Sequence, residues 1–261
     1  MTAAFVCLRP CRGPSTRKDH EDALHDPRRR PPWLAVAAAA GTKGERTPIL
    51  GRPTFARHDP VAFGGTDVVI DCSRGDAVLA NLGAALDAGV RRFVIASTGW
   101  ADARDEVATT LQDAGAIAVV SANFSLGVAI FGRLVDTAAA LFGAVEGFDP
   151  YLVEWHRRGK VDRPSGTALD LARRLTGPAA DPSDLEVVSI RAGSSPGMHL
   201  VGFDAVGETV ELRITARDRS AYASGILAAT DWLRRAPRAP GIHTFEAVVD
   251  ELLASPAGIA A

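Results

Sequence analysis

Between residues 67 and 125, three short apolar runs alternate with two helix-like stretches, and no other feature constrains the fold as strongly. The runs DVVIDCS, RRFVIASTGW and IAVVSANFS have the length and apolar content of buried strands. The stretches between them, which begin at Asp76 and Ala101, have helical periodicity. Because parallel strands require crossovers of helical length, this order predicts a parallel sheet. We therefore predict an α/β fold with a doubly wound, Rossmann-like sheet.

The pattern changes after Phe124. The stretch LGVAIFGRLVDTAAALFGAV predicts a long helix, and YLVEWH predicts a strand. Three further strands with turn signals between them are predicted at LEVVSIRAG, HLVGFDAVG and ETVELRITARD. Helices are predicted at SAYASGILAATDWLRRA and at GIHTFEAVVDELL. This half is typical of a second, α+β domain built on a mixed sheet.

Charge and composition argue against several classes of partner. The chain has 29 Lys and Arg against 31 Asp and Glu, whereas general nucleic-acid and membrane-surface binders carry a basic excess. The three cysteines form neither a disulfide framework nor a zinc spacing. The run WLAVAAAAG is too short to span a bilayer. We expect a cytoplasmic protein with no metal, nucleic-acid partner or membrane.

The segment EWHRRGKVDRPSGTA places a histidine, several cations and a helix start close together. His156 would end a strand, Lys160 would follow in a loop, and Gly166 and Thr167 would open a helix. Free N–H groups at a helix start bind anions. The set suits a small dicarboxylate with a proton donor beside it. The alternative is a solvated basic loop in which Ser165 only caps the helix.

The same segment resembles the signature of the dihydrodipicolinate reductase family, whose members are also called 4-hydroxy-tetrahydrodipicolinate reductases. Other stretches follow the family pattern in the same order, over about residues 60 to 250. They include DVVIDCSRGDAVLANLGAALDAGV, ASTGW, SANFSLGV, IRAGSSPGMHLVGF, GETVELRITARDRSAYASGILAATDWL and GIHTF.

The resemblance implies a role for each matching residue. His156 corresponds to the catalytic acid/base, and Lys160 to the catalytic lysine that protonates the substrate as hydride arrives. Gly166 and Thr167 correspond to the carboxylate-binding pair. Arg157 stands where the family has a second histidine, and we expect it to bind substrate, because a guanidinium can bind a carboxylate but cannot titrate.

The resemblance also implies a cofactor and an assembly. The family reduces a cyclic dicarboxylate imine to tetrahydrodipicolinate with NADPH or NADH, in lysine and diaminopimelate biosynthesis, and is usually a homotetramer. The expected cofactor-binding residues are Ala96, Ser97, Thr98, Ser121, Ala122, Asn123 and Phe124. We expect a dinucleotide-binding domain at 1–124, a substrate-binding and oligomerisation domain at 125–235, and a C-terminal helix at 236–261 that returns to the first domain.

The chain departs from the family pattern before Trp33. The family has a Gly-x-x-Gly-x-x-Gly loop that lets the backbone approach the pyrophosphate, but Gly13 is the only glycine in residues 1–32. We expect residues 1–24 to stand in the place of the first strand and this loop, and WLAVAAAA to form the second strand. The Arg- and Pro-rich stretch that follows Leu8 is typical of a linker.

Three explanations of this departure stay open, namely a shifted reading frame, a wrongly placed start and degeneration of the loop. Lys43 and Arg46 follow the expected second strand, where they would favour the 2′-phosphate of NADPH. Two alternative functions also stay open: a non-catalytic homologue without cofactor, and a related dehydrogenase with another substrate derived from an amino acid.

Overall fold

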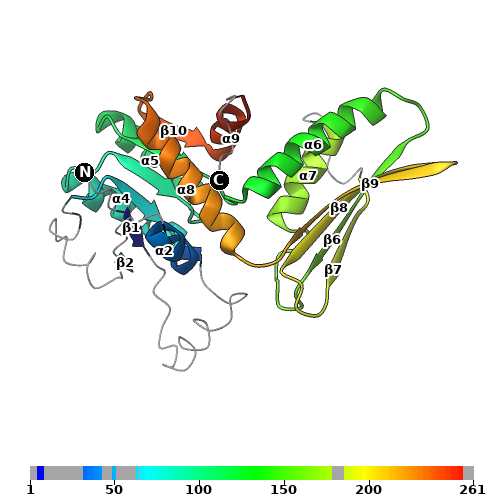
Figure 1. Cartoon of the computed structure of the whole chain (residues 1–261), viewed down its shortest axis with the longest axis horizontal. Coiled ribbons are helices and arrows are strands. Elements are labelled where there is room, and N and C mark those ends of the chain that lie inside the picture. The colour runs from blue at the N-terminus through cyan, green and yellow to red at the C-terminus, as the bar shows by residue number, and fades with distance from the viewer. Residues whose placement is uncertain are drawn as a thin grey trace. The chain divides into compact units, whose positions relative to one another are not determined.

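The computed structural model describes residues 5–8, 32–42, 49–50, 63, 65–177 and 185–254. The chain divides into two compact units. Unit 1 comprises Met1–Leu126 and Arg219–Ala261, and unit 2 comprises Gly127–Asp218. Figure 1 labels most of their helices and strands.

Unit 1 is built on a parallel sheet with the strand order β10-β5-β4-β3-β1-β2. Its strands are β1 (Phe5–Leu8), β2 (Ile49–Leu50), β3 (Val68–Asp71), β4 (Arg92–Ile95), β5 (Ile117–Val120) and β10 (Gly241–Thr244). Its helices are α2 (Pro32–Thr42), α4 (Val78–Asp87), α5 (Arg104–Asp113), α8 (Ser220–Arg235) and α9 (Phe245–Ala254), with 3-10 turns η2 (Gly75–Ala77) and η3 (Ala101–Ala103). The predicted α/β fold is confirmed.

The central strands of unit 1 are buried on both faces of the sheet, which explains why their sequences are continuously apolar. Val69, Phe93 and Ala118 pack in one cluster with residues of α4 and α5. Ile70 and Val94 point to the opposite face and are also fully buried. There α8 contacts β4 and β5, and α2 lies against α8 (Figure 1).

Two predictions of secondary structure in unit 1 are wrong. Residues 33–40, expected as a strand, lie in α2, because alanine has the highest helix propensity and proline is favoured in the first helical turn. Residues 241–244, expected in a helix, form β10 beside β5, and α9 begins only at Phe245. The β-branched Ile242 and Thr244 suit a strand. The strand was missed because the helical pattern that begins at Phe245 was extended over the residues before it.

The segment in the place of the first strand does contain one. Phe5–Leu8 forms β1, which pairs with β3 so that Phe5 lies opposite Val68. Most of the linker-like stretch after Leu8, with Gly13, lies outside the described residues, and so do Lys43 and Arg46.

Unit 2 contains a mixed sheet with the strand order β7-β6-β8-β9. Its strands are β6 (Asp149–His156), β7 (Val187–Arg191), β8 (Gly197–Ala205) and β9 (Glu208–Ala216), and its helices are α6 (Leu126–Gly143) and α7 (Gly166–Thr176). β6 runs parallel to β7 and antiparallel to β8, and β8 and β9 form an antiparallel hairpin. The predicted α+β unit on a mixed sheet is confirmed.

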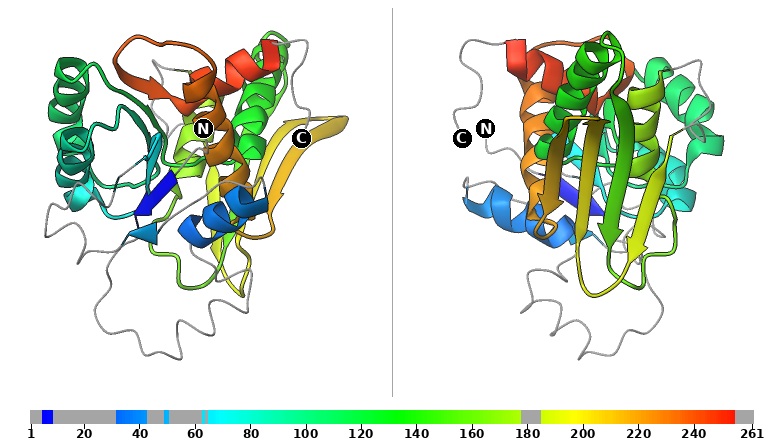
Figure 2. Two further views of the ribbon diagram at one scale, coloured as in Figure 1. Left: turned by 60° about the vertical axis from the view of Figure 1, so that its left-hand side comes forward. Right: turned by 90° about the vertical axis from the view of Figure 1, so that its right-hand side faces the viewer.

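The two helices of unit 2 cover one face of its sheet. In the right panel of Figure 2 the four strands lie in front, and α6 and α7 lie behind them. Phe131 and Val135 of α6 and Leu171 of α7 pack with Leu152 of β6 in the core of the unit. Every second side chain of β6 from Leu152 onward therefore points toward the helices.

Gly225, in the middle of α8, lies where this helix meets the loop after β5. A Cβ atom on Gly225 would lie 1.7 Å from the carbonyl oxygen of Phe124, so the helix or the loop would have to move. We expect Gly225→Ala to lower the free energy of unfolding by about 1–3 kcal/mol, measured by chemical denaturation.

The matched control is Gly83→Ala in α4, where a Cβ meets nothing within 4 Å. Alanine is the better helix former, so we expect this control to keep or raise stability. A Gly225 variant as stable as the Gly83 variant would contradict the close contact.

Candidate active site

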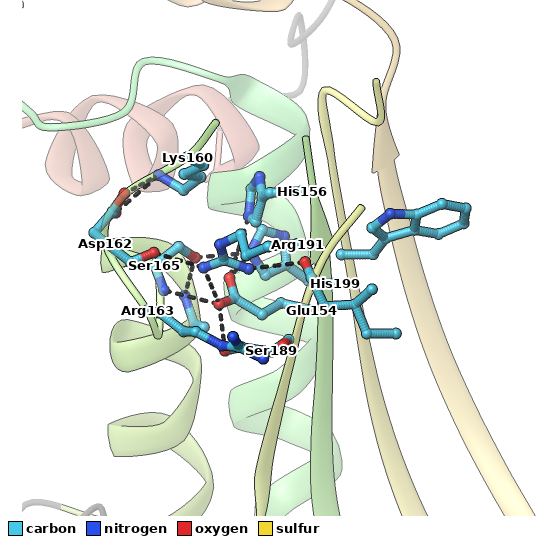
Figure 3. Close-up of polar contacts among 12 residues, drawn as sticks. Glu154, His156, Lys160, Asp162, Arg163, Ser165, Ser189, Arg191 and His199 are labelled. Atoms are coloured by element: carbon cyan, nitrogen blue, oxygen red, sulfur yellow. Dashed lines mark hydrogen bonds and ion pairs between the residues drawn. The ribbon is translucent and has the colours of Figure 1, made fainter. Parts of the chain in front are cut away.

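Strand β6 brings two ionisable side chains to the face of its sheet that the helices cover. Glu154 and His156 are buried and alternate with the exposed Trp155. The register places Glu154 opposite Ser189 on one side and His199 on the other, and pairs His156 with Arg191. Opposite residues of neighbouring strands point to the same face, so these side chains converge, as Figure 3 shows.

Glu154 is the centre of this cluster and has no solvent exposure. Its Oε1 accepts hydrogen bonds from Ser165 N at 3.0 Å, Ser189 Oγ at 2.6 Å and Arg191 Nη2 at 2.6 Å. Burial raises the pKa of Glu154, but the hydrogen bonds from Ser165, Ser189 and Arg191 outweigh it and lower the pKa to about 2. Glu154 is therefore a carboxylate at neutral pH.

The other oxygen of Glu154 faces two imidazoles. Oε2 lies 3.2 Å from Nε2 of His156 and 3.7 Å from Nε2 of His199. Burial lowers the pKa of His156, and the charge of Glu154 opposes that effect. Burial and the neighbouring His156 lower the pKa of His199 to about 4. His199 is therefore neutral near pH 7.

Helix α7 begins beside Glu154. Ser165 caps it: Oγ accepts a hydrogen bond from Ala168 N at 3.2 Å and also lies 3.2 Å from Nε2 of His199. Gly166 and Thr167 follow as the first helical residues. Backbone N–H groups in this position, together with the helix dipole, attract an anion.

Lys160 lies in the loop between β6 and α7. Its Nζ is 2.7 Å from Oδ1 of Asp162, and its side chain is 23% exposed. A hydrogen bond from Lys160 lowers the pKa of Asp162, and the backbone N–H of Gly166 adds to this effect. The charge of Lys160 also lowers the pKa of His156. His156, Lys160 and Gly166 therefore lie in one cluster.

The remaining predicted residues of this set differ in exposure. Thr167 is half-buried, whereas Arg157, directly after β6, is exposed. Glu154 and Arg191 were not predicted, although the alternation in YLVEWH carries a signal. A glutamate two residues after an inward-facing leucine indicates a buried charge, which must be paired.

Glu154, His156 and His199 could hold a metal ion by geometry, since their ligand atoms lie within 4.8 Å of one another. Two observations favour another arrangement. The carboxylate and the His156 ring already lie at ion-pair distance from each other. Arg191, bound to the same carboxylate, would repel a divalent cation. That the protein needs no metal stays a prediction.

In unit 1, the predicted cofactor loop after β4 is anchored by Asp71, at the end of β3. The carboxylate of Asp71 accepts hydrogen bonds from Ser97 Oγ at 2.6 Å, Ser73 Oγ at 2.6 Å and Asn81 Nδ2 at 2.9 Å. Ser97 is buried, Ala96 is half-buried and Thr98 is exposed. The hydroxyl of Ser97 is thus used within the protein.

The second predicted cofactor loop follows β5, which neighbours β4 in the sheet. Ser121 and Asn123 stabilise the turn, because Ser121 Oγ donates to the Asn123 carbonyl at 2.9 Å and Asn123 Oδ1 accepts from Ser125 N at 2.9 Å. Ala122 is exposed. Phe124 is buried against Phe245, with ring centroids 4.9 Å apart. Its side chain therefore belongs to the core of unit 1.

The depressed pKa of His199 predicts that stability depends on pH. Between pH 6.5 and about 4 the unfolded chain takes up a proton that the folded chain does not, so the free energy of unfolding falls as the pH falls. This group contributes roughly 3 kcal/mol, which is fully present above pH 6.5. Denaturant titrations at several pH values measure the change.

His199→Gln keeps a polar side chain near Ser165 but removes the titration. We expect this variant to lose much of the pH dependence in the same window, while the part due to His156 remains. A variant whose stability falls as steeply as that of the wild type would contradict the depressed pKa.

Comparison with known proteins decides the family. Residues 37–124 match the model of the dihydrodipicolinate reductase N-terminus, and residues 127–249 match that of its C-terminus. The chain belongs to the dihydrodipicolinate reductase family. This confirms the family resemblance of the sequence motifs.

Individual members of the dihydrodipicolinate reductase family are similar over most of the chain. A 4-hydroxy-tetrahydrodipicolinate reductase from Xanthomonas campestris pv. campestris is 36% identical over 230 residues, which are 88% of each chain. Its counterpart from Archaeoglobus fulgidus is 34% identical over 76% of this chain and 81% of the relative. A dipicolinate-bound dihydrodipicolinate reductase from Paenisporosarcina sp. TG-14 has the same fold, with a TM-score of 0.63 at 17% identity, over 94% of this chain and 98% of its own.

Proposed function

We propose that this chain is a 4-hydroxy-tetrahydrodipicolinate reductase that uses NADH or NADPH. The observation that carries the proposal is the match to both halves of the family, together with relatives of that name at 34–36% identity. The cluster in unit 2 is chemically suited to this reaction, which needs a dianion site beside a proton donor.

In our proposal the dicarboxylate binds at the start of α7. One carboxylate accepts hydrogen bonds from the backbone of Gly166 and Thr167, where the helix dipole adds to the attraction. Lys160 and the exposed Arg157 supply cationic donors for the dianion. Asp162 holds Lys160 at 2.7 Å in the structure, so a bound carboxylate competes with Asp162 for this ammonium.

Conversion of 4-hydroxy-tetrahydrodipicolinate to tetrahydrodipicolinate adds a hydride and a proton and releases the hydroxyl group as water. The nicotinamide nucleotide supplies the hydride when it is bound. We assign the proton to Lys160, whose side chain is partly exposed and whose ammonium would leave Asp162 to reach a ligand. His156 is buried, and we assign to it the role of acid/base partner of Lys160.

We place the nicotinamide half of the cofactor at the carboxyl edge of the unit 1 sheet. Ala96, Ser97 and Thr98 follow β4, and the loop of Ser121, Ala122, Asn123 and Phe124 follows β5. The described loops fit such a ligand, because Asp71 holds one of them through Ser97 and open sheets bind ligands at this edge. The family's pyrophosphate-binding loop would fall in the stretch after Leu8, which lies mostly outside the described residues.

Nucleotide binding separates the reductase from a homologue that has lost its cofactor. We expect NADH or NADPH to bind saturably, with micromolar affinity, in a titration followed by nicotinamide fluorescence. The cationic Lys43 and Arg46 lead us to propose tighter binding of NADPH. Tighter binding of NADH would overturn only the proposed preference for NADPH. A folded protein that binds neither nucleotide would overturn the reductase proposal.

We also propose that the chain forms a homotetramer through the sheet face of unit 2 that its helices leave uncovered. Trp155, Val188 and Ile190 lie on that face, each about 40% exposed, and an apolar face of this kind is typical of a subunit interface. Light scattering would measure four times the mass of the chain, and a monomer would overturn this assembly.

We place the protein in the cytoplasm, without a membrane segment. Helix α6 has the length and hydropathy of a membrane span. However, its residues Phe131 and Val135 pack in the core of unit 2, so we interpret α6 as a core helix. Recovery of the protein in the soluble fraction after cell lysis tests this proposal.

A further inference from the structure

Both ring nitrogens of His156 face an oxygen of the protein. Nδ1 lies 3.3 Å from the carbonyl oxygen of Pro196, and Nε2 lies 3.2 Å from Oε2 of Glu154. A neutral imidazole carries one N–H and can donate to only one of these oxygens, whereas an imidazolium can donate to both. These two oxygens favour the protonated ring, whereas burial opposes them and lowers the pKa of His156.

Glu154 Oε2 and His156 Nε2 lie 3.2 Å apart, yet among the described residues neither of these buried atoms has a hydrogen-bond partner of normal geometry. His199 lies farther away, at 3.7 Å, and its Nε2 also lies 3.2 Å from Ser165 Oγ. A buried carboxylate oxygen without a donor is costly, so a proton on Nε2 of His156 would remove that cost.

The same carboxylate also fixes the start of α7. Glu154 Oε1 accepts the backbone N–H of Ser165 at 3.0 Å, and Ser165 directly precedes Gly166. One buried side chain therefore contacts both the imidazole and the turn that would bind a carboxylate.

We propose that Glu154 is a positioning residue that holds His156 as an imidazolium and the Ser165–Thr167 turn in place when the dicarboxylate arrives. The identity of the ligand rests on the proposed function, but the effect of Glu154 on His156 does not. Glu154 need not touch the substrate, because it acts through His156 and the turn.

The charges around His156 come from each element packed against it. Burial lowers the pKa of His156 most, and the cations of Lys160 and Arg191 lower it further, while Glu154 raises it. His199, on β8, lies edge-on to the ring with centroids 5.2 Å apart and is neutral. In the free protein the balance is a lowered pKa of His156, and a bound dianion would offset the two cations and raise this pKa.

The position of the ring is also fixed by the backbone. A Cβ atom on Gly197 would lie 2.8 Å from Cε1 of His156 and 3.1 Å from Nδ1. The imidazole therefore packs directly on the Gly197 backbone, and it cannot turn toward that side without a clash. This confinement keeps Nε2 close to Glu154 Oε2, at 3.2 Å.

The direct test is an NMR titration of His156 in the free protein, without substrate or nucleotide. We expect Glu154→Gln to lower the pKa of His156 by about one unit, because the negative charge of Glu154, which raises this pKa, is lost. The matched control is Glu211→Gln, the same change at an exposed glutamate of the same sheet that bonds to Tyr151. It should leave the titration of His156 unchanged.

Kinetics supply a second measurement. If His156 acts as an imidazolium, kcat/KM falls above its pKa, so Glu154→Gln should move this alkaline limb to lower pH by about one unit and lower kcat at least tenfold. A purely structural role would lower activity without moving the limb. Glu211→Gln should retain the wild-type profile.

Three results would overturn the proposal. The first is a pKa of His156 that is unchanged in a folded Glu154→Gln protein. The second is a zinc ion bound at this cluster, seen as one equivalent of zinc in the purified wild type and none in His199→Gln. The third is a pKa of His156 that bound dipicolinate does not raise in the wild type. This measurement needs no variant, so it applies even if Glu154→Gln does not fold. Absent turnover with the expected titration would instead count against the proposed function.

Discussion

Replacing Lys160 with alanine is expected to lower kcat by about 100- to 1,000-fold, because it removes the proposed proton donor. The fold should be nearly unaffected. Lys160 pairs with Asp162, whose side chain is 54% exposed, and such surface ion pairs contribute little to stability. Steady-state rates of nucleotide oxidation and thermal unfolding curves measure the two effects.

Asp162→Asn is the matched control for Lys160→Ala, because both changes break the same ion pair and only one removes the amine. We expect the asparagine variant to keep kcat within a fewfold of the wild type, since the ammonium is then freer to reach the ligand. Near-normal turnover in Lys160→Ala, or an equal loss in Asp162→Asn, would show that the assigned role of the lysine is wrong.

The largest expected effect on stability follows the loss of Arg191. Its guanidinium donates to Glu154 Oε1 and to the Asp162 carbonyl, each at 2.6 Å, and its side chain is 8% exposed. Arg191→Met would leave the Glu154 carboxylate buried without its cation. We expect a loss of about 3–5 kcal/mol in the free energy of unfolding, measured by chemical denaturation.

Two further variants separate the buried charge from lost packing. Arg174→Met makes the same change at an arginine whose carboxylate partners, Asp136 and Asp170, are 40% and 52% exposed, so it should cost much less. Adding Glu154→Gln to Arg191→Met should recover part of the lost stability, because the uncompensated charge is removed. Suppose that Arg191→Met and Arg174→Met lower the free energy of unfolding equally, and that adding Glu154→Gln restores none of it. This result would contradict an ion pair at the centre of the site.

The parts of the fold that follow local patterns could be predicted from the sequence. Alternating apolar runs and helical stretches indicated the parallel sheet of unit 1, and Pro164, Ser165 and Gly177 marked the bounds of α7. The alanine-rich α2 was mistaken for a strand because a short apolar run has no clear period. Length and alanine content were the better guides there.

The site could be predicted only in part. His156, Lys160 and Gly166 lie within eleven residues of one another, so one motif contained them. Glu154 meets Arg191 and His199 only through the register of strands that are 37 and 45 residues away in sequence. Local patterns do not specify which residues of distant strands lie opposite one another, so the centre of the cluster was missed.

The most direct test of the account is to measure substrate-dependent oxidation of the nucleotide by the purified wild-type protein. With 4-hydroxy-tetrahydrodipicolinate and NADPH or NADH present, we predict one nucleotide oxidised for each tetrahydrodipicolinate formed, and a rate at least 100-fold lower for Lys160→Ala. A folded wild-type protein that oxidises neither nucleotide when all reactants are saturating would contradict the account.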